Sequence, residues 1–136
     1  MTAKNDLKKY KALYYEVKYL KREIEEMYNT VRAVNYDEKT GGGNADDLTL
    51  AVVTQILKRK ENFEKKLKEL YAEEERILNM IHQIDNAEIQ RVMILRYINF
   101  KPWAKIQREM NYSEAGIMKL HRQGLVELDS KVQFNK

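Results

Sequence analysis

The sequence predicts an all-α protein: a long antiparallel helical hairpin resembling a coiled coil, followed by a C-terminal three-helix domain. Among 136 residues there are one proline and five glycines, three of them consecutive, so long stretches lack any residue that strongly disfavours a helix. Apolar residues recur at three- and four-residue spacing along most of the chain, which is the period of a helix with one buried face. Hydrophobic residues make up 43% of the chain and aromatic residues 10%, as in soluble helical domains.

A first helix is predicted over about residues 4–33. Its apolar positions alternate by three and four residues for three heptads, which is typical of a coiled-coil seam: Tyr10, Leu13, Val17, Leu20, Ile24, Met27 and Val31. One isolated helix cannot bury such a stripe. The stripe therefore needs a second helix of this chain or of another copy.

Residues 36–47 are predicted to form a loop, because Gly41, Gly42 and Gly43 interrupt the helical pattern. Asp46 or Asp47 can cap the helix that follows. That second helix is expected over about residues 48–84, and its buried face is predicted to comprise Val53, Ile56, Phe63, Leu67, Leu70, Ile77, Ile81 and Ile84, widened by Tyr71 and Leu78. An antiparallel hairpin covers both stripes, and a parallel dimer through the first helix is the rival arrangement.

Residues 85–136 are predicted to contain three shorter helices. Asp85 or Asn86 can cap the first, and Pro102 supplies a first-turn residue for the second. The buried side of the second helix is expected to hold Trp103, Ile106 and Met110.

Asn111 and Tyr112 form the predicted turn, because asparagine tolerates a left-handed backbone, and Ser113 is the predicted cap of the last helix. The core side of that helix is expected to comprise Ile117, Leu120, Leu125 and Leu128. Two short amphipathic helices joined by such a turn have the pattern of a helix-turn-helix, which makes DNA the leading candidate partner.

The remaining side chains of the last helix are predicted to point outward and to read bases. These candidates are Glu114, Ala115, Met118, Lys119, Arg122 and Gln123. Lysine and arginine donate to guanine, glutamine pairs with adenine, and alanine or methionine contacts the thymine methyl group. The phosphate-contact candidates are Lys101, Lys105, Arg108 and His121. A purely structural alternative has Gly116 and Gly124 allowing close helix packing and the cations keeping the surface soluble.

The stretch from Leu95 to Leu128, with LRY, then W and KI, then a turn, S, I, H and L, resembles region 4 of sigma factors. The full layout is similar to phage-encoded late transcriptional regulators of the RinA and ArpU type. That resemblance implies a regulator from a phage or prophage of a Gram-positive bacterium, in contact with RNA polymerase. The chain departs from the family pattern at Gln107 and Gly116.

Several function classes find no support in the sequence. The absence of cysteine excludes disulfides and thiolate metal sites, and His82 and His121 lack metal-ligand spacing, so we expect neither an enzyme nor a metal or cofactor. No apolar run of about 18 residues is available to span a membrane. Since MTAKNDLKKYK is polar, we expect no secretory signal and a cytoplasmic protein in a bacterial host.

The sequence thus predicts two domains, residues 1–84 for assembly or partner binding and residues 85–136 for DNA binding. Residues 85–136 hold nine Lys or Arg against six Asp or Glu, a net charge of +3, which is small for binding duplex DNA alone. We therefore expect a homodimer through the N-terminal helices or a second protein. The alternatives are a protein-binding module that engages a host factor through the hairpin and, third, a small terminase subunit.

Overall fold

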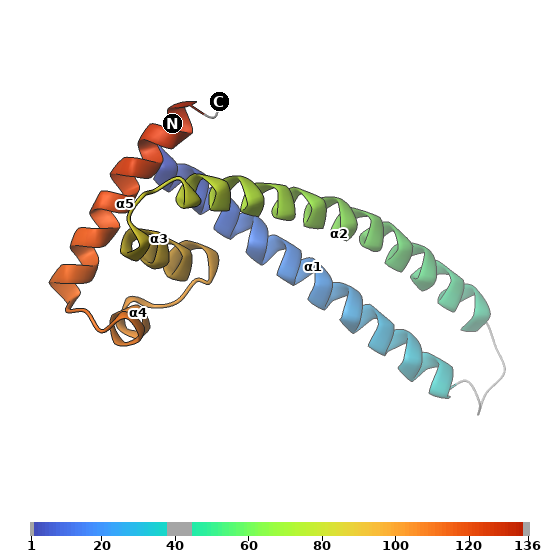
Figure 1. Ribbon diagram of the computed structural model, residues 1–136. Coiled ribbons are helices and arrows are strands. Elements are labelled where there is room, and N and C mark those ends of the chain that lie inside the picture. Colours follow the sequence, from blue (N-terminus) through green and yellow to red (C-terminus); the bar gives the residue numbers. More distant parts are fainter. Residues whose placement is uncertain (1, 38–44, 135–136) are drawn as a thin grey trace. The chain divides into compact units, whose positions relative to one another are not determined.

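All regular secondary structure in the part of the chain that the structure describes, residues 2–37 and 45–134 of a computed structural model, is helical (Figure 1). The predicted all-α class is therefore confirmed. The elements are α1 (Ala3–Asp37), α2 (Ala45–His82), α3 (Ala87–Met93), a π-helical turn (Ile94–Ile98), α4 (Trp103–Met110) and α5 (Glu114–Phe134). The triple glycine of the predicted loop lies outside the described residues.

The chain packs as two compact units. One unit combines Met1–Ala12 with Tyr71–Lys136, and the other comprises Leu13–Leu70. The ends of α1 and α2 thus belong with the C-terminal helices. These packing units do not test the predicted functional domains, residues 1–84 and 85–136, which stay a prediction.

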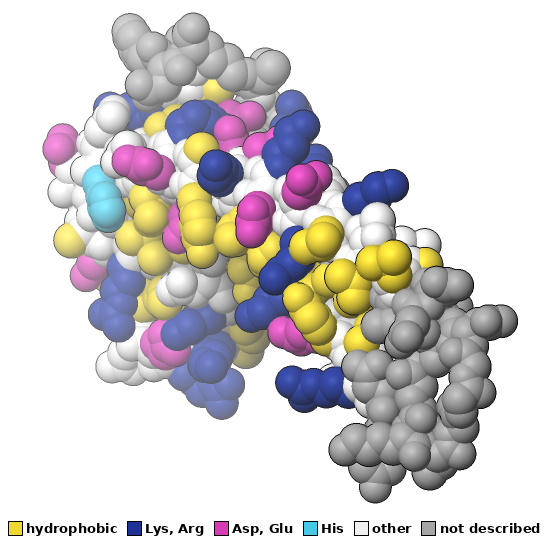
Figure 2. Space-filling view, turned by 90° about the vertical axis from the view of Figure 1, so that its right-hand side faces the viewer, with side chains coloured by type: hydrophobic (Ala, Val, Ile, Leu, Met, Phe, Trp, Pro, Cys, Tyr) yellow, Lys and Arg dark blue, Asp and Glu magenta, His cyan; other side chains and the backbone are white. Residues whose placement is uncertain are grey.

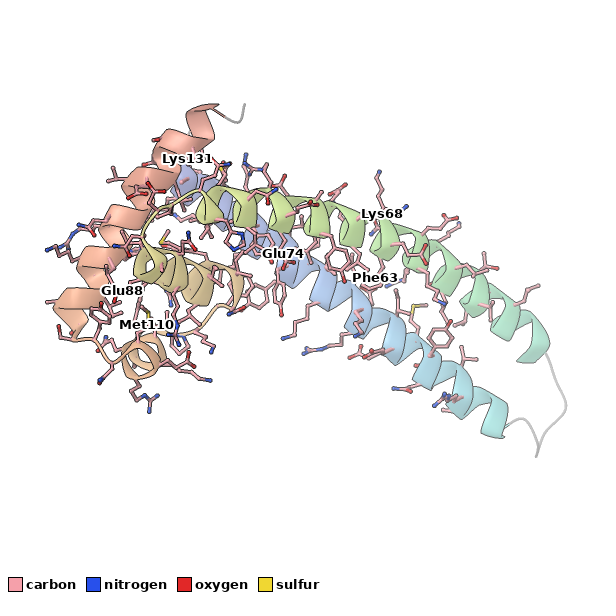
Figure 3. The ribbon with its side chains drawn as sticks, viewed as in Figure 1. Phe63, Lys68, Glu74, Glu88, Met110 and Lys131 are labelled. Carbon is pink, nitrogen blue, oxygen red and sulfur yellow. The ribbon has the colours of Figure 1, made fainter. Side chains whose placement is uncertain are left out.

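In the unit Leu13–Leu70, α1 and α2 run side by side in opposite directions (Figure 1). Ion pairs join them, one between Glu23 and Arg59 and one between Glu16 and Lys66 at 3.8 Å. Because the paired residue numbers fall in α1 as they rise in α2, the two helices are antiparallel. The side chain of Phe63 projects from α2 toward α1 (Figure 3).

The predicted seams of α1 and α2 are partly confirmed by burial. Val17 and Ile24 of α1 and Ile56 and Leu70 of α2 are buried. The predicted face of α2 is too wide, however, because Val53 is 38% exposed and Tyr71 is 60% exposed. A helix pair covers only a narrow stripe of each helix, and these two positions lie outside it.

The core beside α4 is a cluster of Val92, Leu95, Ile106 and Ile117, on which Trp103, Met110, Tyr112, Met118 and Leu120 pack. Val92, Ile106 and Ile117 are fully buried. α3, the π-helical turn, α4 and α5 each contribute a residue to this cluster. It therefore fixes the position of α4 and of the N-terminal half of α5.

The start of α1 is attached to the end of α5. The backbone N–H of Ala3 donates to a carboxylate oxygen of Asp129 at 2.6 Å. Further along α1, the buried carboxylate of Asp6 lies 3.5 Å from the guanidinium of Arg76. By accepting the hydrogen bond from Ala3, Asp129 satisfies one of the backbone N–H groups that a helix start leaves without an intrahelical partner.

Local capping signals largely agree with the structure. Asn86 is the N-cap of α3, and its side chain accepts hydrogen bonds from the backbone N–H groups of Glu88 and Ile89. Asn111 ends α4 in the left-handed conformation, with φ 60° and ψ 46°. The hydroxyl of Ser113 accepts a hydrogen bond from Gly116 N–H at 3.1 Å. The turn and the cap predicted before the last helix are both confirmed.

Two predicted helix starts are corrected. Asp46 and Asp47 lie inside α2, which begins at Ala45, so neither precedes the helix as a cap. Pro102 is the N-cap of α4 rather than its first helical residue, because its ψ of 152° is extended.

The buried ridge of α5 also differs from the prediction. Leu125 is only half-buried, whereas Gly124 and Val132 are buried with Ile117 and Leu128. A Cβ atom at Gly124 would lie 2.5 Å from Sδ of Met93 and 3.2 Å from Cγ2 of Ile89. α5 therefore approaches α3 at Gly124 more closely than a larger residue allows.

Candidate nucleic-acid interface

An exposed stripe follows the first three turns of α5. Ala115, Lys119 and Arg122 succeed one another at four- and three-residue spacing, so their side chains share one side of the helix. All three are exposed, as are Glu114 and Gln123. The stripe is presented outward because Ile117 and Leu128 turn the opposite side of α5 into the core.

Met118 differs from the other base-reading candidates. It is half-buried and packs on the core cluster around Ile106 and Ile117. An unbranched apolar side chain beside a core fills gaps readily, which explains its inward position. Five of the six predicted base-reading residues are thus exposed, and their role in reading bases stays a prediction.

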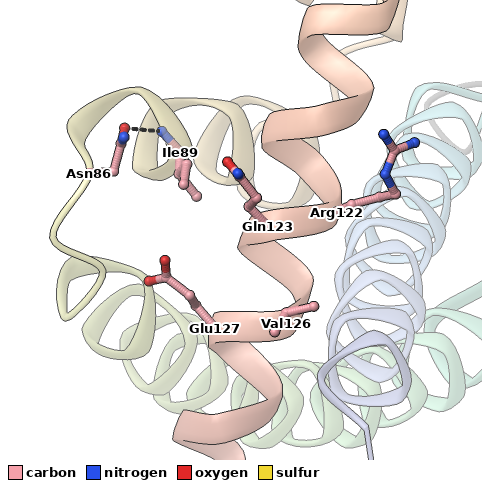
Figure 4. Close-up of a pocket in the computed structure, with 6 residues that line it drawn as sticks. All are labelled: Asn86, Ile89, Arg122, Gln123, Val126 and Glu127. Carbon is pink, nitrogen blue, oxygen red and sulfur yellow. Dashed lines mark hydrogen bonds between the residues drawn. The ribbon is translucent and has the colours of Figure 1, made fainter.

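Farther along α5, Arg122 and Gln123 line a shallow pocket of about 510 Å³. Asn86 and Ile89 form its α3 side, and Val126 and Glu127 continue its α5 side (Figure 4). The pocket is open, and its wall carries one cation and one carboxylate. The pocket extends the exposed surface of α5, and the charges of Arg122 and Glu127 in its wall cancel.

The cations on and beside α4 fall into two classes. Lys105 and Arg108 are exposed. Lys101 is instead half-buried, with its ammonium 2.7 Å from a carboxylate oxygen of Glu109. That hydrogen bond lowers the pKa of Glu109. Lys105 and Arg108 therefore remain better placed to bind phosphates than Lys101.

His121 lies inside an aromatic cluster rather than on the surface. Its ring centre is 4.7 Å from that of Trp103 in an edge-to-face arrangement and 5.6 Å from that of Tyr97 in a stacked one. Its Nε2 atom is hydrogen-bonded to the Tyr97 hydroxyl. Burial is the main cause that lowers the pKa of His121, and the charges of Arg96, Lys4 and Arg122 lower it further. A half-buried neutral imidazole is poorly suited to hold a phosphate.

The π-helical turn supplies two residues of this cluster that the sequence analysis did not assign to the site. Arg96 lies 4.5 Å from the centre of the Trp103 ring, and its guanidinium donates to the Lys101 carbonyl at 3.1 Å. Tyr97 binds His121. No local sequence pattern marks a π-helical turn, because its wider hydrogen bonding is set by the surrounding packing. Arg96, Trp103 and His121 together connect the π-helical turn, α4 and α5.

The lowered pKa of His121 predicts a pH-dependent stability. An unfolded histidine binds a proton near pH 6.5, whereas the folded protein resists protonation until a lower pH. As the pH falls, the unfolded state therefore binds a proton before the folded state does. The contribution of His121 to the free energy of unfolding is thus complete above pH 6.5 and is lost as the pH falls toward the lowered pKa. We expect the denaturant midpoint, followed by the fluorescence of Trp103, to fall over that range.

The matched control uses the second histidine of the chain, His82, which is exposed on α2. His121→Gln should flatten the pH dependence of the denaturant midpoint, whereas His82→Gln should leave that pH dependence unchanged. An unchanged slope in His121→Gln would show that other groups cause the pH dependence.

Charge on the surface is mixed. From Lys101 to Lys131 there are six Lys or Arg and four Asp or Glu, a net of +2. On the face in Figure 2, cationic and anionic side chains are interspersed with hydrophobic ones.

Among the described residues no group of three or more His, Cys, Asp or Glu is placed to hold a metal ion. Within residues 2–37 and 45–134, no helix combines the length and apolar character that crossing a membrane requires.

A protein family model matches most of the chain. Neither a curated protein nor a solved structure matches the chain. Residues 33–129 match the family model described as "Protein of unknown function (DUF1492)". This match includes the end of α1, all of α2, α3 and α4, and most of α5. Since it covers well over half of the chain, the protein belongs to the DUF1492 family.

Proposed function

We propose that this protein is a sequence-specific DNA-binding transcription regulator in which α4, the turn at Asn111 and α5 form a helix-turn-helix. The observation that carries the proposal is the exposed stripe of Ala115, Lys119 and Arg122 on a helix capped by Ser113. In this arrangement α5 enters the major groove, and its N-terminal residues contact base edges.

The chemistry of the stripe suits base recognition. Arginine and lysine donate to the O6 and N7 atoms of guanine, and a methyl group such as that of Ala115 contacts the thymine methyl. Gln123 lies beside Arg122 and offers the donor and acceptor pair that adenine requires. Glu114 can accept a hydrogen bond from the amino group of cytosine.

The exposed cations of α4 support the same orientation. Lys105 and Arg108 precede the turn, where the first helix of such a motif crosses the phosphate backbone. Arg96, which is held on the Trp103 ring, and His121 instead position α4 against α5. We therefore assign phosphate contacts to Lys105 and Arg108 and a positioning role to His121.

The resemblance of residues 95–128 to sigma region 4 supports the same assignment. The similarity of the whole layout to RinA- and ArpU-type regulators further suggests a regulator of phage or prophage genes that acts together with RNA polymerase.

The proposal is tested by fluorescence anisotropy with duplex fragments of phage promoters at low salt. We expect Lys119→Ala and Arg122→Ala each to weaken binding to the preferred fragment by about tenfold to a hundredfold. Lys105→Ala and Arg108→Ala should weaken binding to all fragments alike and make the salt dependence shallower.

The control is Lys58→Ala, which removes an exposed cation of α2 in the unit Leu13–Leu70. It should bind as the unchanged protein does. Absence of binding at low salt, or equal binding by the Lys119 and Arg122 variants, would contradict the proposal.

A further inference from the structure

The outer side of α1 carries tyrosines and cations in alternation. Tyr15, Lys18, Tyr19 and Arg22 follow a three- and four-residue spacing and line one shallow pocket of about 210 Å³. Tyr15 is 48% exposed and Tyr19 is 64% exposed. We call these four residues the α1 face. Large exposed rings on a helix are costly to leave in water and are typical of contact surfaces.

Ion pairs with described residues involve the carboxylates of α1 but not the two cations of the α1 face. Glu16 and Glu23 of α1 pair with Lys66 and Arg59 of α2. By contrast, Lys18 and Arg22 form no ion pair with any residue in 2–37 or 45–134. A ligand of this surface should therefore bring carboxylates beside apolar groups.

A surface of that chemistry lies on α2 of the other unit. Tyr71, Glu74, Glu75, Leu78, Asn79 and His82 line a shallow pocket of about 360 Å³, with the same three- and four-residue spacing. We call Tyr71, Glu74, Glu75 and Leu78 the α2 face. Glu74, labelled in Figure 3, and Glu75 form no ion pair with another described residue. The α2 face thus combines negative charge with the exposed ring of Tyr71.

We propose that the α1 face of one copy binds the α2 face of a second copy, so that the protein is a dimer. Lys18 and Arg22 meet Glu74 and Glu75, and the rings of Tyr15 and Tyr19 cover Tyr71 and Leu78. Matching helix spacing allows the side chains of the two faces to interdigitate. Because each copy carries both faces, the contact closes into a dimer when it forms twice around a two-fold axis.

The composition of the α1 face favours a protein over a nucleic acid. Affinity for a nucleic-acid backbone comes largely from the counterions that the phosphates release when Lys or Arg neutralises them. Two cations release too few counterions for tight binding. Tyrosine and arginine are instead the residues that carry most of the binding energy at protein interfaces. The dimer goes beyond DNA binding and does not depend on it, but it would supply two copies of α5 and explain how a weakly charged domain binds DNA.

The test is sedimentation velocity of the full chain without DNA over micromolar concentrations. We expect a species of twice the 16.2 kDa chain mass that dissociates as salt is raised. Lys18→Glu with Arg22→Glu should raise the dissociation constant by about a hundredfold, because like charges then face each other. Glu74→Lys with Glu75→Lys should do the same.

The combined variant with all four reversals should dimerise again, since each new charge meets an opposite one. Lys58→Glu with Lys65→Glu, two charge reversals at exposed residues of α2 outside both pockets, is the control and should leave the dimer intact. Circular dichroism verifies that each variant keeps its helices. A monomer at every concentration, a dimer indifferent to the reversals, or no rescue in the combined variant would overturn the proposal. DNA binding by a strictly monomeric protein would overturn the dimer and leave the proposed function standing.

Discussion

Gly124→Leu is expected to lower the free energy of unfolding by about 3 kcal/mol. Even a Cβ atom at this position would lie 2.5 Å from Sδ and 2.9 Å from Cγ of Met93. Met93 is fully buried, so its side chain has no space into which it can move without disturbing α3. The greater helix propensity of leucine returns only about 1 kcal/mol.

Chemical denaturation measures this loss through Trp103, the only tryptophan of the chain. Ser130→Leu places the same side chain at an exposed position of α5 and should change stability by no more than about 0.5 kcal/mol. Equal stability of Gly124→Leu and Ser130→Leu would show that α5 does not pack closely on α3 at Gly124.

Ile106→Ala is expected to cost about 3 kcal/mol, because it removes methyl and methylene groups from a site with no exposure to solvent. Ile106 is the α4 residue of the cluster with Val92, Leu95 and Ile117. A cavity there loosens α4 against α5. We therefore expect weaker DNA binding as well as lower stability, although Ile106 is buried and does not contact DNA.

The control for Ile106→Ala is Val126→Ala, which truncates an apolar side chain of α5 that is 68% exposed. It should change stability by less than about 0.5 kcal/mol. If Val126→Ala proved as costly as Ile106→Ala, the described core would be wrong.

Sequence reasoning succeeds where the determining interaction is local. Asn86, Asn111 and Ser113 were predictable because a cap or a left-handed turn is formed by one side chain and its neighbouring backbone. The long helices were predictable because their apolar period persists over many turns. Gly124 appeared among the glycines suited to close packing, and the structure places it against Met93.

Sequence reasoning fails where distant packing decides. Tyr71 and Leu125 fit an apolar helical period, but the neighbouring elements leave them wholly or partly exposed. The sequence pattern predicts that Met118 points outward, but Met118 packs on the core, because the period alone does not fix how wide the buried stripe is.

The aromatic cluster illustrates the same limit. His121 looked like a surface residue beside Arg122, yet Tyr97 and Trp103, each 18 or more positions away, enclose it. Arg96 could not be assigned, because its place over Trp103 follows from the π-helical turn. The exposed stripe of α5 was predictable, since it is what remains once the buried ridge is removed.

Selection of bound sequences from a random duplex library tests most directly whether the exposed stripe of α5 reads DNA. The unchanged protein should enrich a short defined motif, and the variant with Lys119→Ala and Arg122→Ala should lose that preference while keeping weak, salt-sensitive binding. Enrichment of the same motif by both proteins, or of no motif by either, would contradict base reading by this helix.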